Sequence, residues 1–83
     1  MRHFCLDGRW MQRTKEGYDY IYETLGVLEC VGKNLDALYD CLTEMGRNTE
    51  IEIDHPEDMD QMIKKVILNA AKANECLKII LTK

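Results

Sequence analysis

This sequence of 83 residues lacks long apolar runs, and its basic residues are outnumbered by acidic ones. Its 11 lysines and arginines face 15 acids, which leaves a formal net charge of −4 at pH 7. Phosphate binding needs clustered basic side chains, so this balance argues against a nucleic acid partner and favours a basic protein. The apolar runs are too short to cross a membrane, and Met1-Arg2-His3 leads into no signal-peptide core. We therefore expect a cytoplasmic chain without a membrane partner.

The cysteines also lack a recognisable arrangement. No paired C-x-x-C spacing and no export signal accompanies the four of them, Cys5, Cys30, Cys41 and Cys76. Two disulfides are the alternative, but this context favours reduced thiols, which we predict for all four. We expect no zinc site, because only His3 and His55 could assist the thiols and neither shows ligand spacing.

No catalytic pattern is evident either. Asp36, Asp40 and His55 could serve as acids or bases and the cysteines as nucleophiles, but no pair has a catalytic spacing. A glycine-rich phosphate loop is also missing from the sequence. We therefore expect neither an enzyme nor a bound cofactor or metal. A small enzyme stays an alternative that turnover lost in Asp40→Ala would support.

The pattern of apolar residues predicts one α/β domain over residues 1–83. Hydrophobic residues make up 46% of the chain and charged residues 31%, as in ordinary globular proteins. We expect a buried strand at 3–7, an alternating, half-exposed edge strand at 49–54 and a buried last strand at 77–81.

Helical segments separate these strands. Thr14 and Gly26 are suited to begin and end the first helix, and Pro56 fits the first turn of one long helix reaching Ala73. Strands joined through helices pair in parallel by right-handed crossovers. If the helices all cover one face, the result is a two-layer fold with a three-stranded parallel sheet in the order 1-2-3.

The most informative stretch is the helix expected at 35–45. Asn34 can cap its start, and Gly46 can close its end in a left-handed conformation. Helical spacing places one set of side chains on a core-facing stripe, namely Leu35, Leu38, Leu42 and Met45. It directs a second set away from that stripe, namely Asp36, Asp40 and Thr43.

The two aspartates are like charges four residues apart, an arrangement that does not support a helix. Asp36 is compensated by the helix dipole, whereas Asp40 lies beyond the first turn. Residues 29–50 hold five acids and two bases, a net charge of −3, which is most of the excess in the chain. A solvated acidic face and a surface that binds a partner are both open on this pattern.

The run Gly-x-Asn-Leu-Asp-Ala-Leu-Tyr-Asp-Cys-Leu-Thr at 32–43 resembles the signature of the barstar family, intracellular protein inhibitors of a secreted bacterial ribonuclease. The family carries a tryptophan where this chain has Tyr39. Residues 4–8 look like the family's first strand and turn, and 25–29 look like the lead-in to its binding loop. Residues 71–73 and 79–81 also match. The resemblance implies the two-layer α/β fold of the family.

The resemblance further implies a ribonuclease inhibitor. Helix 35–45 and the preceding loop would block the active site of a basic extracellular-type ribonuclease or a ribonuclease toxin domain, with carboxylates mimicking RNA phosphate. Asp40 would enter the phosphate site, as its counterpart does in the family. The implied partner-binding residues are Asp36, Asp40, Thr43, Asn34, Gly32 and Tyr39. The free chain is expected to be a monomer.

Several positions depart from the family pattern. Cys30 and Val31 stand where the family has two tyrosines, and Lys33 replaces an acid. The late-helix glutamate that reaches the enzyme falls on Ala70. These departures indicate a diverged partner with the plugging mechanism kept. The alternatives are a barstar-like interaction or immunity module without ribonuclease inhibition, and a structural or self-associating module.

Overall fold

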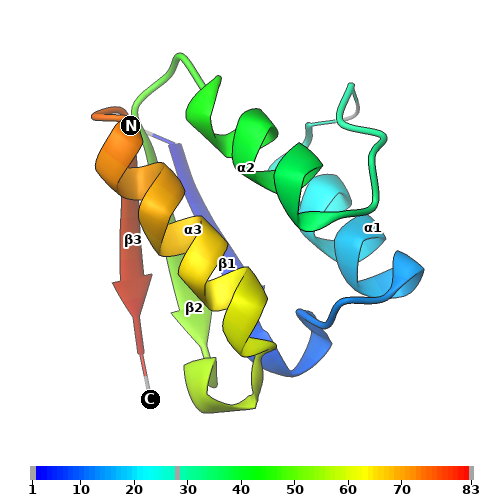
Figure 1. The fold of residues 1–83 in the computed structure, drawn as a ribbon. Helices are drawn as coiled ribbons and strands as arrows, with labels where there is room; N and C mark the ends of the chain where they lie inside the picture. The colour runs from blue at the N-terminus through cyan, green and yellow to red at the C-terminus, as the bar shows by residue number, and fades with distance from the viewer. Residues whose placement is uncertain (1, 28, 83) are drawn as a thin grey trace.

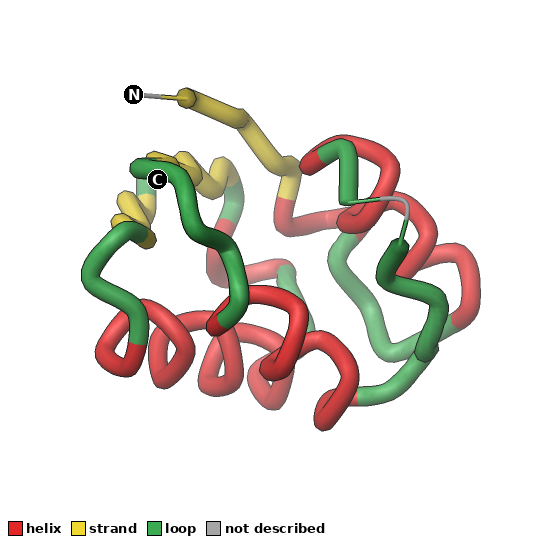
Figure 2. The backbone as a smooth tube through the Cα atoms, turned by 90° about the horizontal axis from the view of Figure 1, so that it is seen from above, coloured by secondary structure: helices red, strands yellow, loops and turns green. Residues whose placement is uncertain are grey.

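Three α-helices lie on one face of a three-stranded sheet in the computed structural model (Figures 1 and 2). It describes residues 2–27 and 29–82, so the predictions that fall on Met1, Leu28 and Lys83 lie outside the described residues. The elements are β1 (Arg2–Asp7), η1 (Gly8–Trp10), α1 (Lys15–Leu25), α2 (Leu35–Thr43), β2 (Thr49–Asp54), η2 (Pro56–Asp58), α3 (Gln61–Ala73) and β3 (Leu77–Leu81). None of the described helices has the length and apolar character needed to span a bilayer.

The sheet confirms the predicted α/β class, with parallel strands in the order β1-β2-β3. Ile51 of β2 is paired with Phe4 on one side and with Ile79 on the other, so β2 is the central strand. Its prediction as an edge strand was wrong, because alternation reports a sheet covered on one face only, whatever the position of the strand. The last strand, β3, is one of the two edge strands and is only half buried, not fully buried as predicted.

The helices and the covered face of the sheet share one hydrophobic cluster. Its fully buried members come from every layer and include Leu6, Ile21, Leu38, Ile51, Ile63 and Ile67. Leu38 and Leu42 of α2 face this cluster, and α2 packs against α3. The exposed side of α2 is therefore held by a packed core and not by local helix propensity alone.

Polar side chains define the ends of the helices. The Thr14 hydroxyl accepts a hydrogen bond from the Gly17 N–H at 3.0 Å, and Gly26 ends α1 at φ +71°, both as predicted. Asn34 caps α2 as predicted, since its side-chain oxygen accepts from the Ala37 N–H at 2.8 Å. The predicted left-handed Gly46 was wrong, because α2 ends at Thr43 with Glu44 as its C-cap in a right-handed conformation.

The long helix predicted from Pro56 is divided into two elements. Pro56 begins the short η2, and α3 starts only at Gln61. Asp60 causes the break: its carboxylate accepts from the N–H groups of Met62 at 2.9 Å and Ile63 at 3.1 Å. An aspartate that caps the next helix takes an extended backbone and cannot continue the preceding one.

Candidate functional site

Helix α2 presents an acidic face opposite its buried leucines. Leu38 has none of its surface exposed, whereas Asp36 and Asp40 are exposed one turn apart. Among the residues that the structure describes, neither carboxylate forms an ion pair. Two negative charges therefore stand free on a helix whose other side is fixed in the core.

The loop before α2 lies close against the first turn of that helix. The Tyr22 hydroxyl donates a hydrogen bond to the Gly32 carbonyl at 2.6 Å and ties the loop to α1. A Cβ added at Gly32 would lie only 2.5 Å from the Ala37 Cβ. Glycine is thus required at this position by the close approach of loop and helix.

Lys33 fastens the same loop to α1. Its ammonium group lies 2.5 Å from a carboxylate oxygen of Asp19 and 5.5 Å from the centre of the Tyr22 ring. The hydrogen bond from Lys33 lowers the pKa of Asp19 below its ordinary value. The lysine charge is therefore paired within the fold and leaves the acids of α2 without a compensating base.

Cys30 and Cys41 form a disulfide that connects this loop to α2, so the prediction of four free thiols is wrong for this pair. Their Cα atoms are 6.2 Å apart, a separation that disulfides span. The two cysteines are 11 residues apart in the sequence, and only the folding of the loop back along α2 brings them together. Cys5 and Cys76 are free, as predicted.

The other residues of the predicted site differ in solvent exposure. Tyr39 is 36% exposed, and Asn34 is exposed beside its cap hydrogen bond. Thr43 is half-buried, and its hydroxyl donates to the Asp40 carbonyl at 3.0 Å, which leaves the oxygen free to accept another hydrogen bond. An open pocket of about 420 Å³ lies beside the start of α2 and is lined by Arg13, Tyr18, Lys33, Asn34, Leu35 and Asp36.

Val31 and Ala70, two departures from the family pattern, differ in solvent exposure. Val31 is 77% exposed at the tip of the loop, a high value for a β-branched apolar side chain. Ala70 has none of its surface exposed and packs in the core. This point of α3 therefore offers no side chain to a partner.

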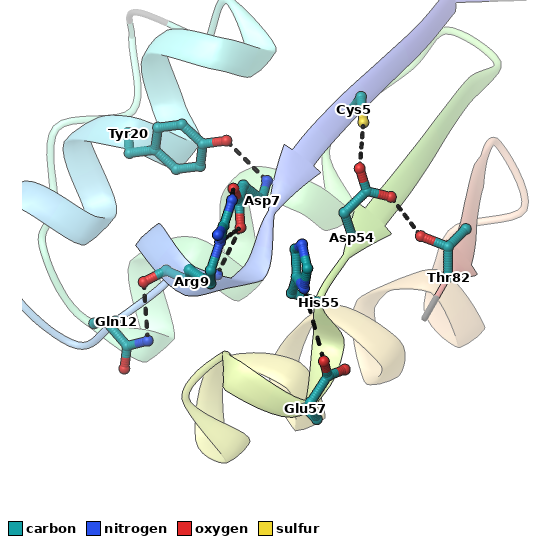
Figure 3. A network of polar contacts seen from close by, with 9 residues as sticks. All are labelled: Cys5, Asp7, Arg9, Gln12, Tyr20, Asp54, His55, Glu57 and Thr82. Atoms are coloured by element: carbon teal, nitrogen blue, oxygen red, sulfur yellow. Dashed lines mark hydrogen bonds and ion pairs between the residues drawn. The ribbon is translucent and has the colours of Figure 1, made fainter.

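A second cluster of polar side chains lies where β1 and β2 end, as Figure 3 shows. The Asp7 carboxylate pairs with the Arg9 guanidinium at 2.8 Å and also accepts from the Arg9 N–H at 2.9 Å. The side-chain hydrogen bond from Arg9 lowers the pKa of Asp7 to about 2. The Tyr20 hydroxyl accepts from the Asp7 N–H at 2.8 Å. These contacts join the end of β1 to η1 and α1.

Polar contacts also join the chain at β1, the end of β2 and the residue after β3 (Figure 3). Asp54 accepts from the Cys5 thiol at 3.6 Å and from the Thr82 hydroxyl. Partial desolvation and the nearby Asp54 carboxylate raise the pKa of the exposed Cys5 thiol, which keeps it protonated at neutral pH. His55 lies 3.8 Å from Glu57, and within residues 2–27 and 29–82 no histidine is hydrogen-bonded to a cysteine. Neither histidine therefore activates a cysteine thiol as a nucleophile in this part of the structure.

Two sets of side chains near these strand ends offer atoms of the type that bind metals. Their ligand atoms lie within 4.8 Å of one another in each set, Cys5, Glu52 and Asp54 in one and His55, Glu57 and Asp58 in the other. Each set is half-buried or exposed and consists mainly of carboxylates. Structural zinc sites are closed tetrahedra of cysteine and histidine, which neither set provides.

The sequence patterns did not reveal two ties that shape the loop, the disulfide and the Lys33–Asp19 ion pair. Both join residues more than ten positions apart, so neither belongs to a local helical or strand pattern. The sequence did carry one indication of these two contacts. Cys30 and Lys33 are both positions at which this chain departs from the family pattern.

The comparison with known families matches most of the chain. Residues 1–79 match the family model described as "Barstar (barnase inhibitor)". A search of curated proteins gives no match to the chain. The matched region includes β1, α1, the loop, α2, β2 and α3, and therefore contains the whole candidate site.

Proposed function

Because the chain belongs to the barstar family, we propose that it inhibits a basic microbial ribonuclease by covering the active site of the enzyme with α2 and the preceding loop. The observation that supports this most directly is the pair of exposed carboxylates, Asp36 and Asp40, on a capped helix fixed in the core. The protein itself acts as a binding partner and not as an enzyme. It works as a monomer in the cytoplasm.

The chemistry of inhibition is phosphate mimicry. A ribonuclease presents basic side chains around the scissile phosphate, and a rigidly held carboxylate can accept their charge-assisted hydrogen bonds. Asp40 enters the phosphate site and Asp36 binds beside it. Neither side chain has an ion pair to break among the described residues, so the enzyme receives both charges without competition inside the inhibitor.

The other residues of the predicted site either shape the binding surface or extend the contact beyond the two aspartates. Gly32 and Asn34 set the path of the loop and the start of α2, while Tyr39 and Thr43 extend the contact along the helix. Val31 adds an exposed apolar contact at the loop tip. Together these residues form a polar centre with an apolar edge, which a basic cleft with an apolar rim would complement.

A diverged partner is the second candidate, and buried Ala70 and exposed Val31 favour it. The family contact assigned to Ala70 cannot form, because that side chain lies in the core. Val31 offers an apolar contact where the family offers tyrosine. The partner in this case is a toxin domain whose surface accepts an apolar loop tip, bound as an immunity module without ribonuclease inhibition.

Inhibition assays with several purified basic ribonucleases, barnase among them, separate these candidates. Initial rates of RNA cleavage are measured over a concentration series of the purified protein. Inhibition at one-to-one stoichiometry of at least one enzyme supports the proposed function. Binding to a ribonuclease fold without loss of cleavage supports the second candidate, and neither binding nor inhibition across the set contradicts the proposed function.

A further inference from the structure

The Cys30–Cys41 disulfide crosses the candidate binding surface. Cys30 lies in the loop two residues before Gly32, and Cys41 follows Asp40 on α2. Both cysteines are half-buried against the edge of the core, so a small reductant can reach them. The bond therefore joins the two elements that the proposed function uses together.

Few other contacts hold the outer part of this loop. Within the described residues 29–34, Lys33 pairs with Asp19, Gly32 accepts from the Tyr22 hydroxyl and Asn34 caps α2, so residues 32–34 are held without the disulfide. Residues 29–31 have one hydrogen bond of this kind, from the Cys30 N–H to the Val27 carbonyl at 3.0 Å. Glu29 and Val31 are exposed. Apart from the disulfide, no hydrogen bond or ion pair within the described residues joins residues 29–34 to the second half of α2, where Asp40 lies.

We propose that this disulfide is a redox-sensitive clamp that holds the loop in its binding shape, so that reduction weakens the binding of the ribonuclease. The proposal rests on the proposed function. A loop already held in its bound shape loses less conformational entropy on binding, which strengthens affinity. Freed by reduction, the loop samples other shapes, and the apparent affinity falls with the fraction that remains competent.

The redox step is ordinary thiol–disulfide exchange with a dithiol. A thiolate of the dithiol attacks one sulfur of the Cys30–Cys41 bond, and its second thiol then resolves the mixed disulfide. The inhibitor gains two electrons and two protons as two thiols, and the dithiol becomes a cyclic disulfide. Disulfides in the reducing cytosol are commonly transient or redox-sensing, which agrees with a reversible clamp in a protein of the proposed location.

The coupling is reciprocal. If the oxidised form binds the enzyme tenfold more tightly, the bound enzyme shifts the equilibrium of the disulfide toward the oxidised form by the same tenfold. A complex formed in the oxidised state would thus resist reduction. The free inhibitor would lose its clamp first.

Two measurements on oxidised and dithiothreitol-reduced protein test the clamp. The first is inhibition of barnase, or of whichever ribonuclease is inhibited, with enzyme alone checked in the same reductant. The second is amide hydrogen exchange, comparing the Cys30 N–H, which is hydrogen-bonded to the Val27 carbonyl, with the β2 residues Ile51 and Ile53. We expect reduction to raise the inhibition constant about tenfold or more and to speed exchange at Cys30 but not in β2.

Variants separate the clamp from general stabilisation. The double variant Cys30→Ser/Cys41→Ser should inhibit as the reduced protein does, with or without reductant. The matched control Cys76→Ser, which changes a free cysteine, should respond to reductant like the unchanged protein. Faster exchange throughout the sheet, rather than at the Cys30 N–H alone, would mean that reduction loosens the whole fold and would overturn the clamp.

The outcomes distinguish this proposal from the proposed function. Equal inhibition by the oxidised and reduced forms overturns the clamp and leaves the proposed function intact. Four free thiols that persist after mild oxidation of the purified protein also overturn it. If neither form inhibits any ribonuclease, the proposed function fails. Exchange at the Cys30 N–H then decides the clamp alone, since unchanged exchange overturns it and faster exchange supports it.

Discussion

Asn74 is a buried side chain that holds the end of the helix carrying the candidate site. Its amide nitrogen donates to the carbonyls of Leu42 and Met45, both at 2.9 Å, and its oxygen accepts from the Cys76 N–H at 2.9 Å. The last carbonyls of a helix have no partner within the helix. Asn74 supplies that partner from the chain that follows α3, and so links the end of α2 to the start of β3.

Replacing Asn74 by alanine should therefore lower the free energy of unfolding by about 1–3 kcal/mol, because buried carbonyls lose their donors. Urea denaturation of the variant and the unchanged protein measures this difference. Asn69→Ala, which changes an exposed asparagine of α3, is the matched control and should have little effect. Equal stability of the two variants would show that Asn74 does not support α2.

The sequence did not predict this role, for a physical reason. Local patterns favour glycine as the residue that ends a helix, and Gly46 stood at a suitable distance. An asparagine beyond the next helix can provide the same hydrogen bonds once the chain has folded. Asn34 was predictable because an N-cap bonds to its own helix, three residues away.

At the scale of elements, α3 depends on its cap. Burial would raise the pKa of Asp60, but hydrogen bonds from the Ile63 N–H and the Arg13 side chain outweigh it and lower that pKa. An aspartate with a lowered folded pKa stabilises the fold above its unfolded pKa of about 3.9. That contribution is lost as the pH falls through the folded pKa.

Asp60→Ala should lower the free energy of unfolding at pH 7 by about 0.5–2 kcal/mol, the usual effect of losing an N-cap. The difference from the unchanged protein should shrink as the pH falls below about 4, where protonation removes the charge. Chemical denaturation at several pH values measures both effects. Asp60→Asn, which keeps a capping oxygen without the charge, should lose less stability at pH 7. A pH-independent difference for both variants would contradict the assignment.

At the scale of the whole molecule, the parallel sheet and its strand order were predictable. Strands separated by helices leave few topologies, and all three helices lie on one face as this order requires. The loop geometry was not predictable. It depends on the disulfide, on Lys33 with Asp19 and on Tyr22 with Gly32, which are contacts between segments.

The charge distribution of the molecule predicts how fast it meets its partner. With a net charge of −3 in residues 29–50, association with a basic enzyme should be steered and should slow as salt increases. The screening length falls to about 10 Å at 0.1 M salt. Stopped-flow association rates at low and high salt measure this. A rate that salt leaves unchanged would indicate an apolar interface instead of an acidic one.

Asp40 is the proposed phosphate mimic, and Asp40→Asn examines this role because it removes the charge while keeping the shape of the side chain. Inhibition constants are measured against the inhibited ribonuclease, with thermal melts of the free protein and Glu57→Gln as an exposed acidic control in η2. We predict an unchanged melt and a loss of about 2–5 kcal/mol in binding, a range for which the barnase–barstar complex is itself the reference case. Inhibition equal to that of Glu57→Gln, with a normal melt, would show that Asp40 is not the phosphate mimic.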